Sequence, residues 1–215
     1  MASLIKNIFF FTCNRSEYYI LEPLIDKFHN SKKYNVKIMV SSSHLKLRYG
    51  NTIKDINSKY NKLIIKNNYK DSLRNFNSLS LKVNKLIKRH RPSLIVILGD
   101  RNEAMVAAMT AFILKIPIAH IHGGEKTKGS YDDIHRHVIT KFSNIHFCVE
   151  KMYKKRLLQL GEDKKMIFNF GYLSKDNIQK IKRINKDEYL NTINLKYNKF
   201  VLLLIHPTGE NKKTN

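Results

Sequence analysis

The chain has 215 residues, of which 42% are hydrophobic and 10% aromatic, and this apolar content excludes a disordered protein. Its 8 Gly and 4 Pro exclude collagen-like and linker-like classes. A formal net charge of +23 is typical of nucleic-acid binders, but the Lys residues are spread over the whole sequence, so we attribute the charge to biased amino-acid usage and expect no nucleic-acid partner.

Apolar runs of strand length alternate with longer helical patterns, which predicts a doubly wound α/β sheet. Most of the runs are continuously apolar, as expected for parallel strands that are covered on both faces. The expected strands are residues 7–12, 36–41, 94–98, 116–121, 146–149, 166–170 and 200–205. The expected helices are residues 17–30, 73–89, 102–114, 131–141 and 151–160. The polar segment 49–69 is not assigned.

A domain boundary is expected near residues 170–171. Residues 1–170 would form a Rossmann-like domain, and 171–215 a linker and the first strand of an incomplete second domain. A charged helical stretch at 174–190 precedes the apolar run 200–205. Too few residues follow that run to complete a domain.

The two cysteines, Cys13 and Cys148, lie in apolar strand-like segments and are expected to be small core residues. Their spacing indicates neither a disulfide framework nor a zinc site. The apolar run 8–11 is far too short to span a membrane. We therefore expect a cytoplasmic protein without a membrane partner.

Polar residues follow several of the predicted strands, where open parallel sheets bind ligands. Arg15 precedes a helix and would either hold an anion at its N-terminus or be an ordinary surface residue. Asp100 ends a buried strand, followed by Arg101. It is either the N-cap of the next helix, which the preference for Asp at N-caps favours, or an acid–base group.

The segment His122-Gly123-Gly124-Glu125 follows another strand. Paired glycines permit positive φ and close approach of the backbone to a ligand, and Glu125 is well placed for a catalytic carboxylate. No metal-ligand spacing is matched, so no metal is expected. The next helix begins with Asp132 and Asp133, which either complement the helix dipole or join Arg136 at the same site.

At this point the sequence resembles the hydrolysing UDP-N-acetylglucosamine 2-epimerases, in the branch that makes N-acetylmannosamine or its diacetamido analogue for sialic- or legionaminic-acid-type sugars. The resemblance rests on TCNRSEY at 12–18, GDRNEA at 99–104, IPIAHIHGGE at 116–125, DDIHRHVITK at 132–141, FNFGYL at 168–173 and the run before His206-Pro207. It implies a GT-B-like fold of two domains, with the UDP-sugar between them.

The resemblance also implies roles for individual residues. Asp100, Glu125 and Asp133 would be the acid–base carboxylates, and His206 would act near the departing diphosphate. The position of Asp133 more often carries Glu in the family. Substrate contacts are expected from Arg15, Arg101, His122, Gly123, Gly124 and Arg136.

The implied reaction eliminates UDP from UDP-N-acetylglucosamine or UDP-N,N'-diacetylbacillosamine and then hydrates the resulting glycal. It needs two positioned acid–base groups and no cofactor. Family members continue through a complete second domain, so this chain is expected to be inactive alone; a homodimer is compatible with the sequence. The alternatives are part of a GT-B glycosyltransferase and a non-catalytic remnant.

Overall fold

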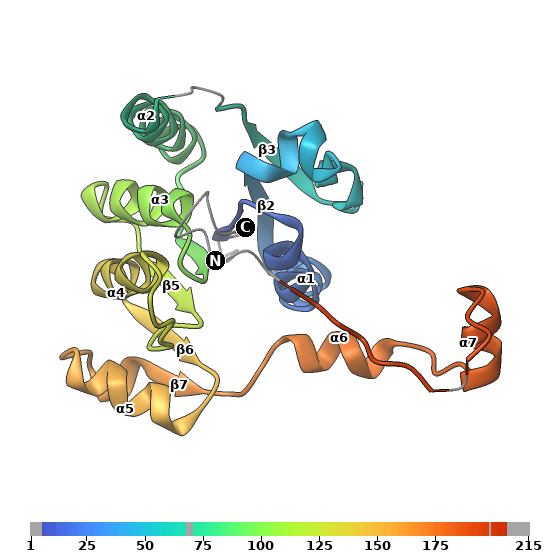
Figure 1. The fold of residues 1–215 in the computed structure, drawn as a ribbon. Helices are drawn as coiled ribbons and strands as arrows, with labels where there is room; N and C mark the ends of the chain where they lie inside the picture. The colour runs from blue at the N-terminus through green and yellow to red at the C-terminus, as the bar shows by residue number, and fades with distance from the viewer. Residues whose placement is uncertain (1–5, 68–70, 198, 206–215) are drawn as a thin grey trace.

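The computed structural model describes residues 6–67, 71–197 and 199–205. Its centre is a seven-stranded sheet in the order β3-β2-β1-β4-β5-β6-β7, with every neighbouring pair parallel (Figure 1). The strands are β1 (Lys6–Thr12), β2 (Tyr34–Ser41), β3 (Asn61–Ile65), β4 (Leu94–Leu98), β5 (Ile118–Ile121), β6 (Ile145–Cys148) and β7 (Ile167–Asn169). The prediction of a parallel α/β sheet is confirmed.

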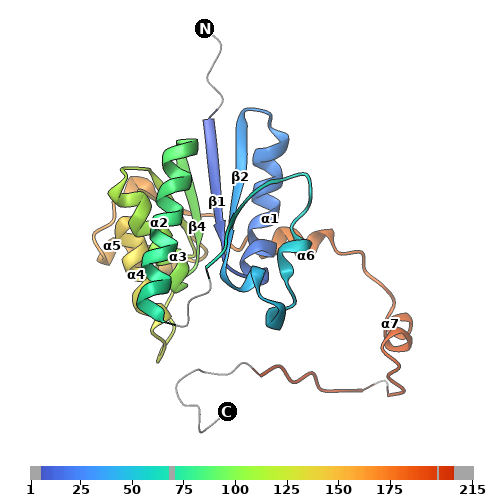
Figure 2. The ribbon, with the colours of Figure 1, turned by 90° about the horizontal axis from the view of Figure 1, so that it is seen from above.

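Helices cover both faces of the sheet. Helices α2 to α5 lie on one face, and α1 and α6 on the other (Figures 1 and 2). The α-helices are α1 (Arg15–Asn30), α2 (Ser72–His90), α3 (Asn102–Ile113), α4 (Asp132–Phe142), α5 (Lys151–Gln159), α6 (Ser174–Lys180) and α7 (Lys186–Thr192). Short 3₁₀ helices span Ser42–Leu45, Leu47–Tyr49, Thr52–Asp55 and Lys164–Met166.

The central strand β1 explains why its sequence is continuously apolar. Phe9 and Phe11 pack into the core beneath α2 and α3, whereas Ile8 and Phe10 pack into the core beneath α1. Successive side chains of a strand point to opposite faces, so a strand covered on both sides needs apolar residues at every position. Cys13 and Cys148 are also buried, as predicted.

Strand β3 lies in the segment that the sequence left unassigned. It is an edge strand, because β2 is its only partner in the sheet. Only Ile65 of its five residues is buried, and Lys62 donates to the carbonyl of Ile56 instead of packing in a core. An edge strand exposed in this way tolerates polar residues, which removes the apolar signature on which strand prediction depends.

The chain beyond β7 differs from the prediction in two respects. The helical stretch expected at 174–190 is divided into α6 and α7 by non-helical residues 181–185. The strand expected at 200–205 is wrong: these residues form no ladder and are exposed, because no described strand lies beside them to accept their backbone hydrogen bonds. Helix α6 contacts α1, with Lys27 Nζ 3.8 Å from Asp176 Oδ2. The boundary at 170–171 stays a prediction.

The chain winds outward in opposite directions from β1 and β4, which are adjacent in the sheet. This arrangement leaves a crevice at their carboxyl ends, where open α/β sheets bind ligands. The loops that follow β1, β4 and β5 therefore define the place to search for a site.

Candidate active site

The loop after β1 begins helix α1 with a hydrogen-bonded cap. Asn14 Oδ1 accepts the backbone N–H of Glu17 at 2.9 Å, and the Glu17 carboxylate accepts the N–H of Cys13 at 2.7 Å. This pattern resembles a capping box, except that Glu17 accepts the N–H of Cys13, the residue before the N-cap, and not that of Asn14 itself. Arg15 is the first residue of the helix and its side chain is exposed, so it is free to meet a ligand; its predicted role in binding an anion stays a prediction.

Glu17 is a buried carboxyl group that the sequence reasoning did not single out. Burial raises its pKa from 4.5 to about 7, although hydrogen bonds from the backbone of Cys13 and the charge of Arg101 lower it. The spacing Asn14-x-x-Glu17 was the available signal, because it matches a capping box. The proximity of Glu17 to Arg101 arises only from the tertiary structure, so the sequence alone does not predict it.

Asp100 is not the N-cap of α3. The residue at that cap is Arg101, whose side chain makes no capping hydrogen bond. The Asp100 carboxylate is instead ion-paired with Arg136 of α4, whose side chain is only 7% exposed. Burial raises the pKa of Asp100, and Arg136 opposes that shift, so the local structure of this carboxylate is set by a partner that lies far along the chain.

His120 holds the end of β4 in place from within β5. Its Nε2 is 2.8 Å from the carbonyl oxygen of Gly99, and its Nδ1 is 3.1 Å from Thr140 Oγ1. Complete burial lowers its pKa to about 3, so the ring is neutral at physiological pH. A neutral ring between Gly99, which adopts φ +81°, and α4 fixes the turn that carries Asp100.

The residue after β5, His122, has a left-handed backbone conformation with φ 66°. Such conformations are uncommon for residues other than glycine and cluster at functional sites. Its Nδ1 is 2.8 Å from Glu125 Oε1. Within the described part of the chain, His122 Nε2 is buried without a hydrogen-bond partner, so this nitrogen is available to form a hydrogen bond with a ligand.

The two glycines between this pair pack against the protein interior. A Cβ on Gly124, which has φ +80°, would lie 2.6 Å from the carbonyl oxygen of Tyr153 in α5, and Arg156 donates to the Gly124 carbonyl. A Cβ on Gly123 would lie 3.1 Å from His120 Nδ1. Close approach of the loop to α5 is thus one reason for glycine here; substrate binding by these glycines stays a prediction.

The adjacent residues Asp132 and Asp133 have different surroundings. Asp133 Oδ1 accepts the backbone N–H of Thr127 at 2.9 Å, which fastens the loop between Glu125 and α4. Asp132 is half-exposed, and its charge helps to raise the pKa values of both Asp100 and Arg101. Asp132 also shares a helix face with Arg136, four residues on, which reaches Asp100.

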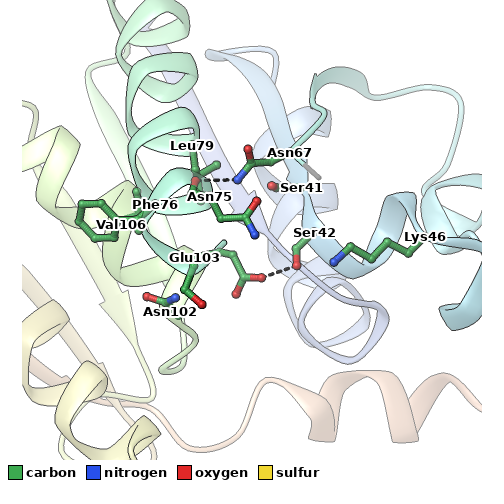
Figure 3. Close-up of a pocket in the computed structure, with 11 residues that line it drawn as sticks. Ser41, Ser42, Lys46, Asn67, Asn75, Phe76, Leu79, Asn102, Glu103 and Val106 are labelled. Carbon is green, nitrogen blue, oxygen red and sulfur yellow. Dashed lines mark hydrogen bonds between the residues drawn. The ribbon is translucent and has the colours of Figure 1, made fainter. Parts of the chain in front are cut away.

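Arg101 connects the carboxylates to a polar pocket. Its Nε lies 3.6 Å from Glu103 Oε2, and although burial lowers its pKa, acidic neighbours led by Glu103 raise that pKa above the ordinary value. Glu103 accepts a hydrogen bond from Ser42, a buried residue with φ 54°. Figure 3 shows Ser42 and Glu103 in the lining of a cavity of about 110 Å³ between α2, α3 and the end of β2.

Three further expectations concern residues or partners of the whole chain. His206 lies outside the described residues. Over 6–67, 71–197 and 199–205, no three His, Cys, Asp or Glu side chains are grouped so that they could hold a metal ion. None of the helices in those ranges is both long enough and apolar enough to cross a membrane.

The fold therefore gathers Asp100, Glu125 and Asp132 at the carboxyl edge of β4 and β5, with Arg101 and Arg136 among them. The three carboxylates differ in burial and in the basic side chain beside them, which is Arg136 for Asp100, His122 for Glu125 and His135 for Asp132. Carboxylates in unlike environments are able to divide acid and base roles between them. The arginines supply positive charge for an anionic ligand.

Comparison with known proteins points in the same direction. The family model described as UDP-N-acetylglucosamine 2-epimerase matches residues 26–215. A GDP/UDP-N,N'-diacetylbacillosamine 2-epimerase (hydrolyzing) of Campylobacter jejuni is 34% identical over 97% of this chain and 56% of its own length. A UDP-N,N'-diacetylbacillosamine 2-epimerase (hydrolyzing) of Legionella pneumophila is 29% identical over 95% of this chain and 56% of its own.

The fold is also similar to that of solved structures. The crystal structure of UDP-GlcNAc 2-epimerase from Neisseria meningitidis bound to UDP-GlcNAc superposes with a TM-score of 0.70 and 19% identity, over 89% of this chain and 52% of that one. This supports the GT-B-like fold class. The chain spans about half the length of the relatives that it matches.

Proposed function

Since this chain belongs to the UDP-N-acetylglucosamine 2-epimerase family, we propose that it carries the acid–base groups for the hydrolysing 2-epimerisation of a UDP-sugar. The products are UDP and a free sugar that is inverted at C2. The observation that supports this most directly is the convergence of Asp100, Glu125 and Asp132 around a buried arginine at the switch point of the sheet.

The reaction needs groups of this kind because the C2 proton is only weakly acidic. Removal of that proton is coupled to departure of UDP, and the C1–oxygen bond breaks as the C1–C2 double bond forms. Water then adds across this double bond, with hydroxyl at C1 and a proton at C2 on the face opposite to the one that lost it. Two acid–base groups are required, each contributing roughly 10²–10⁴-fold.

We assign these groups from their surroundings. Asp132 is half-exposed, lies 3.7 Å from His135 Nδ1 and acts electrostatically on Asp100, whereas Asp133 fastens the preceding loop. Asp100, whose pKa is raised by burial and whose carboxylate is held by Arg136, is the second candidate for proton transfer. Glu125, beside His122, is the third candidate. Arg15 would face the diphosphate and Arg101 the sugar, and His206 is proposed to assist departure of the diphosphate.

The relatives narrow the substrate class. Two of them are named for UDP-N,N'-diacetylbacillosamine, so we propose a UDP-sugar with two acetamido groups, as used for legionaminic-acid-type sugars. We further propose a cytoplasmic location, where nucleotide sugars are made; the two buried, unpaired cysteines are compatible with a reducing compartment.

The test is turnover in D₂O. The 215-residue chain, alone and fused to the remaining part of the Campylobacter jejuni relative, is incubated with each UDP-sugar while UDP release is measured. Proton NMR of the sugar then reports the C2 configuration and deuterium at C2. We expect UDP release by the fusion without any acceptor, with inverted C2 carrying solvent deuterium.

A glycosyltransferase would release UDP only with an acceptor and would leave the C2 hydrogen in place. Retention of that hydrogen would therefore contradict the proposal. A fusion that carries Asp132→Asn and Asp100→Asn is the matched inactive control.

A further inference from the structure

The polar pocket beside Arg101 is not needed for proton transfer, and its lining is unusual for a small cavity. Polar groups from separate elements converge on it: Ser42 after β2, Lys46 in the following loop, Asn75 of α2 and Glu103 of α3 (Figure 3). Ser42 holds a left-handed backbone conformation, and its hydroxyl donates to Glu103. A non-glycine residue in that conformation beside a cavity is typical of functional sites.

The lining of the pocket offers both hydrogen-bond donors and hydrogen-bond acceptors. Lys46 supplies an ammonium donor, Glu103 supplies a carboxylate that also lies 3.6 Å from Arg101, and the remaining polar groups are amides and hydroxyls. An amide offers one N–H and one carbonyl, which a carboxylate and an amide or ammonium donor can satisfy together.

The size of the pocket agrees with an acylamido substituent. Its volume of about 110 Å³ is somewhat smaller than the roughly 150 Å³ of an apolar protein cavity that binds benzene, which has six non-hydrogen atoms. An acetamido group has four non-hydrogen atoms. The apolar side chains of Phe76, Leu79 and Val106 also line the cavity and suit a terminal methyl group.

The position of the pocket connects it to the candidate active site. Glu103, in its lining, lies 3.6 Å from Arg101, which directly follows Asp100 in the chain. A single side chain thus separates the pocket from the carboxylates. A sugar whose C2 lies among the carboxylates would direct a substituent from the opposite side of its ring past Arg101.

From this geometry we propose that the pocket lined by Ser42, Lys46, Asn75 and Glu103 binds the second acylamido group of a diacetamido UDP-sugar and selects it over a sugar that bears hydroxyl there. The proposal rests on the proposed function, because it assumes that C2 lies among the carboxylates. A hydroxyl in its place lacks both the carbonyl and the N–H of an amide, so the sugar would lose the hydrogen bonds that the amide makes with the pocket, which disfavours binding.

The test measures binding, so that it does not depend on turnover. Affinities of the 215-residue chain for UDP, UDP-N-acetylglucosamine and UDP-N,N'-diacetylbacillosamine are compared by calorimetry, for the wild type and for Asn75→Leu. Asn77→Leu makes the same change on the exposed side of the same helix and is the matched control. Thermal unfolding verifies that both variants are folded.

We expect the diacetamido substrate to bind roughly ten-fold more tightly than the monoacetamido one, the value of one or two satisfied hydrogen bonds. Asn75→Leu should abolish this preference without changing the affinity for UDP, and Asn77→Leu should retain it. In NMR spectra of the wild type, the side-chain amide of Asn75 should shift with the diacetamido substrate only. Equal affinities, a preference that survives Asn75→Leu, or an Asn75 amide that shifts with both substrates would each overturn the proposal.

Failure of the proposed function is distinguishable from failure of the subsite. If the fusion protein neither binds a UDP compound nor releases UDP, the proposed function is contradicted, and the subsite is then judged on the 215-residue chain with the methyl glycoside of N,N'-diacetylbacillosamine. A shift of the Asn75 amide that is absent with methyl N-acetylglucosaminide would uphold the subsite, and no shift with either would overturn it.

Discussion

Arg136 of α4 is ion-paired with Asp100, which directly follows the turn after β4, and Arg136 is almost completely buried. Because removal of one partner leaves an uncompensated buried charge, Arg136→Met should lower the free energy of unfolding by about 3 kcal/mol. Arg101→Met is the control, since Arg101 is 43% exposed, and should cost less than about 1 kcal/mol. Urea denaturation of both variants measures this difference. Equal losses of unfolding free energy would contradict the prediction that the buried ion pair contributes more to stability than the exposed one.

We expect substitutions of the adjacent residues Asp132 and Asp133 to have different effects on activity. Asp132→Asn should reduce UDP release by roughly 10²–10⁴-fold in the fusion protein, since it removes an acid–base group. Asp133→Asn should retain most activity, because the amide oxygen can still accept the N–H of Thr127. Steady-state kinetics of the two variants decides between them. The reverse pattern would restore Asp133 to the catalytic role that family resemblance assigns to it.

Stability should depend on pH through Glu17. Folding raises its pKa from 4.5 to about 7, so the folded state holds the proton more tightly than the unfolded chain. The associated stability is therefore complete below about pH 4.5 and is lost as the pH rises through about 7. Glu17→Gln cannot titrate, and its stability relative to wild type should rise by about 3 kcal/mol across this window. Urea denaturation measures the free energies of unfolding of both proteins at about pH 5 and about pH 8. The same difference between variant and wild type at both pH values would contradict the prediction.

Two glycine substitutions distinguish the effect of close packing against α5 from the effect of a positive φ. Gly124→Ala should destabilise the protein by about 3 kcal/mol, because its Cβ would lie 2.6 Å from the Tyr153 carbonyl oxygen. Gly161→Ala shares the positive φ but meets no atom within 4 Å, and should cost about 1 kcal/mol. Thermal unfolding gives the comparison. Similar losses would mean that φ alone requires glycine at position 124.

The sequence predicted those elements whose cause is local. Strand β4 was predicted at its observed bounds because a continuously apolar run lies between Ser93 and Gly99. Strand β3 was missed because an exposed edge strand does not need apolar residues on both faces. The run at 200–205 has strand composition but no neighbouring strand among the described residues, and composition alone cannot supply a partner.

The candidate site divides in the same way. The sequence placed Asp100 and Glu125 at the ends of adjacent strands, which the parallel topology then brings together. It favoured an N-cap role for Asp100 because the competing partner, Arg136, is on a different helix. The distinction between Asp132 and Asp133 depends on the phase of α4, which one residue of uncertainty at a helix start reverses.

The central position of β1 also determines the order in which the chain is able to fold. One edge of β1 pairs with β2 soon after synthesis, but its other edge must wait for β4, which begins at residue 94. Until then one backbone edge of β1 is unpaired and its side chains, which include Phe9, Phe10 and Phe11, are incompletely covered. Both features promote association with other chains. Strand β1 is therefore completed only after β4 has been made, and we expect slow folding with a need for chaperone protection during that interval.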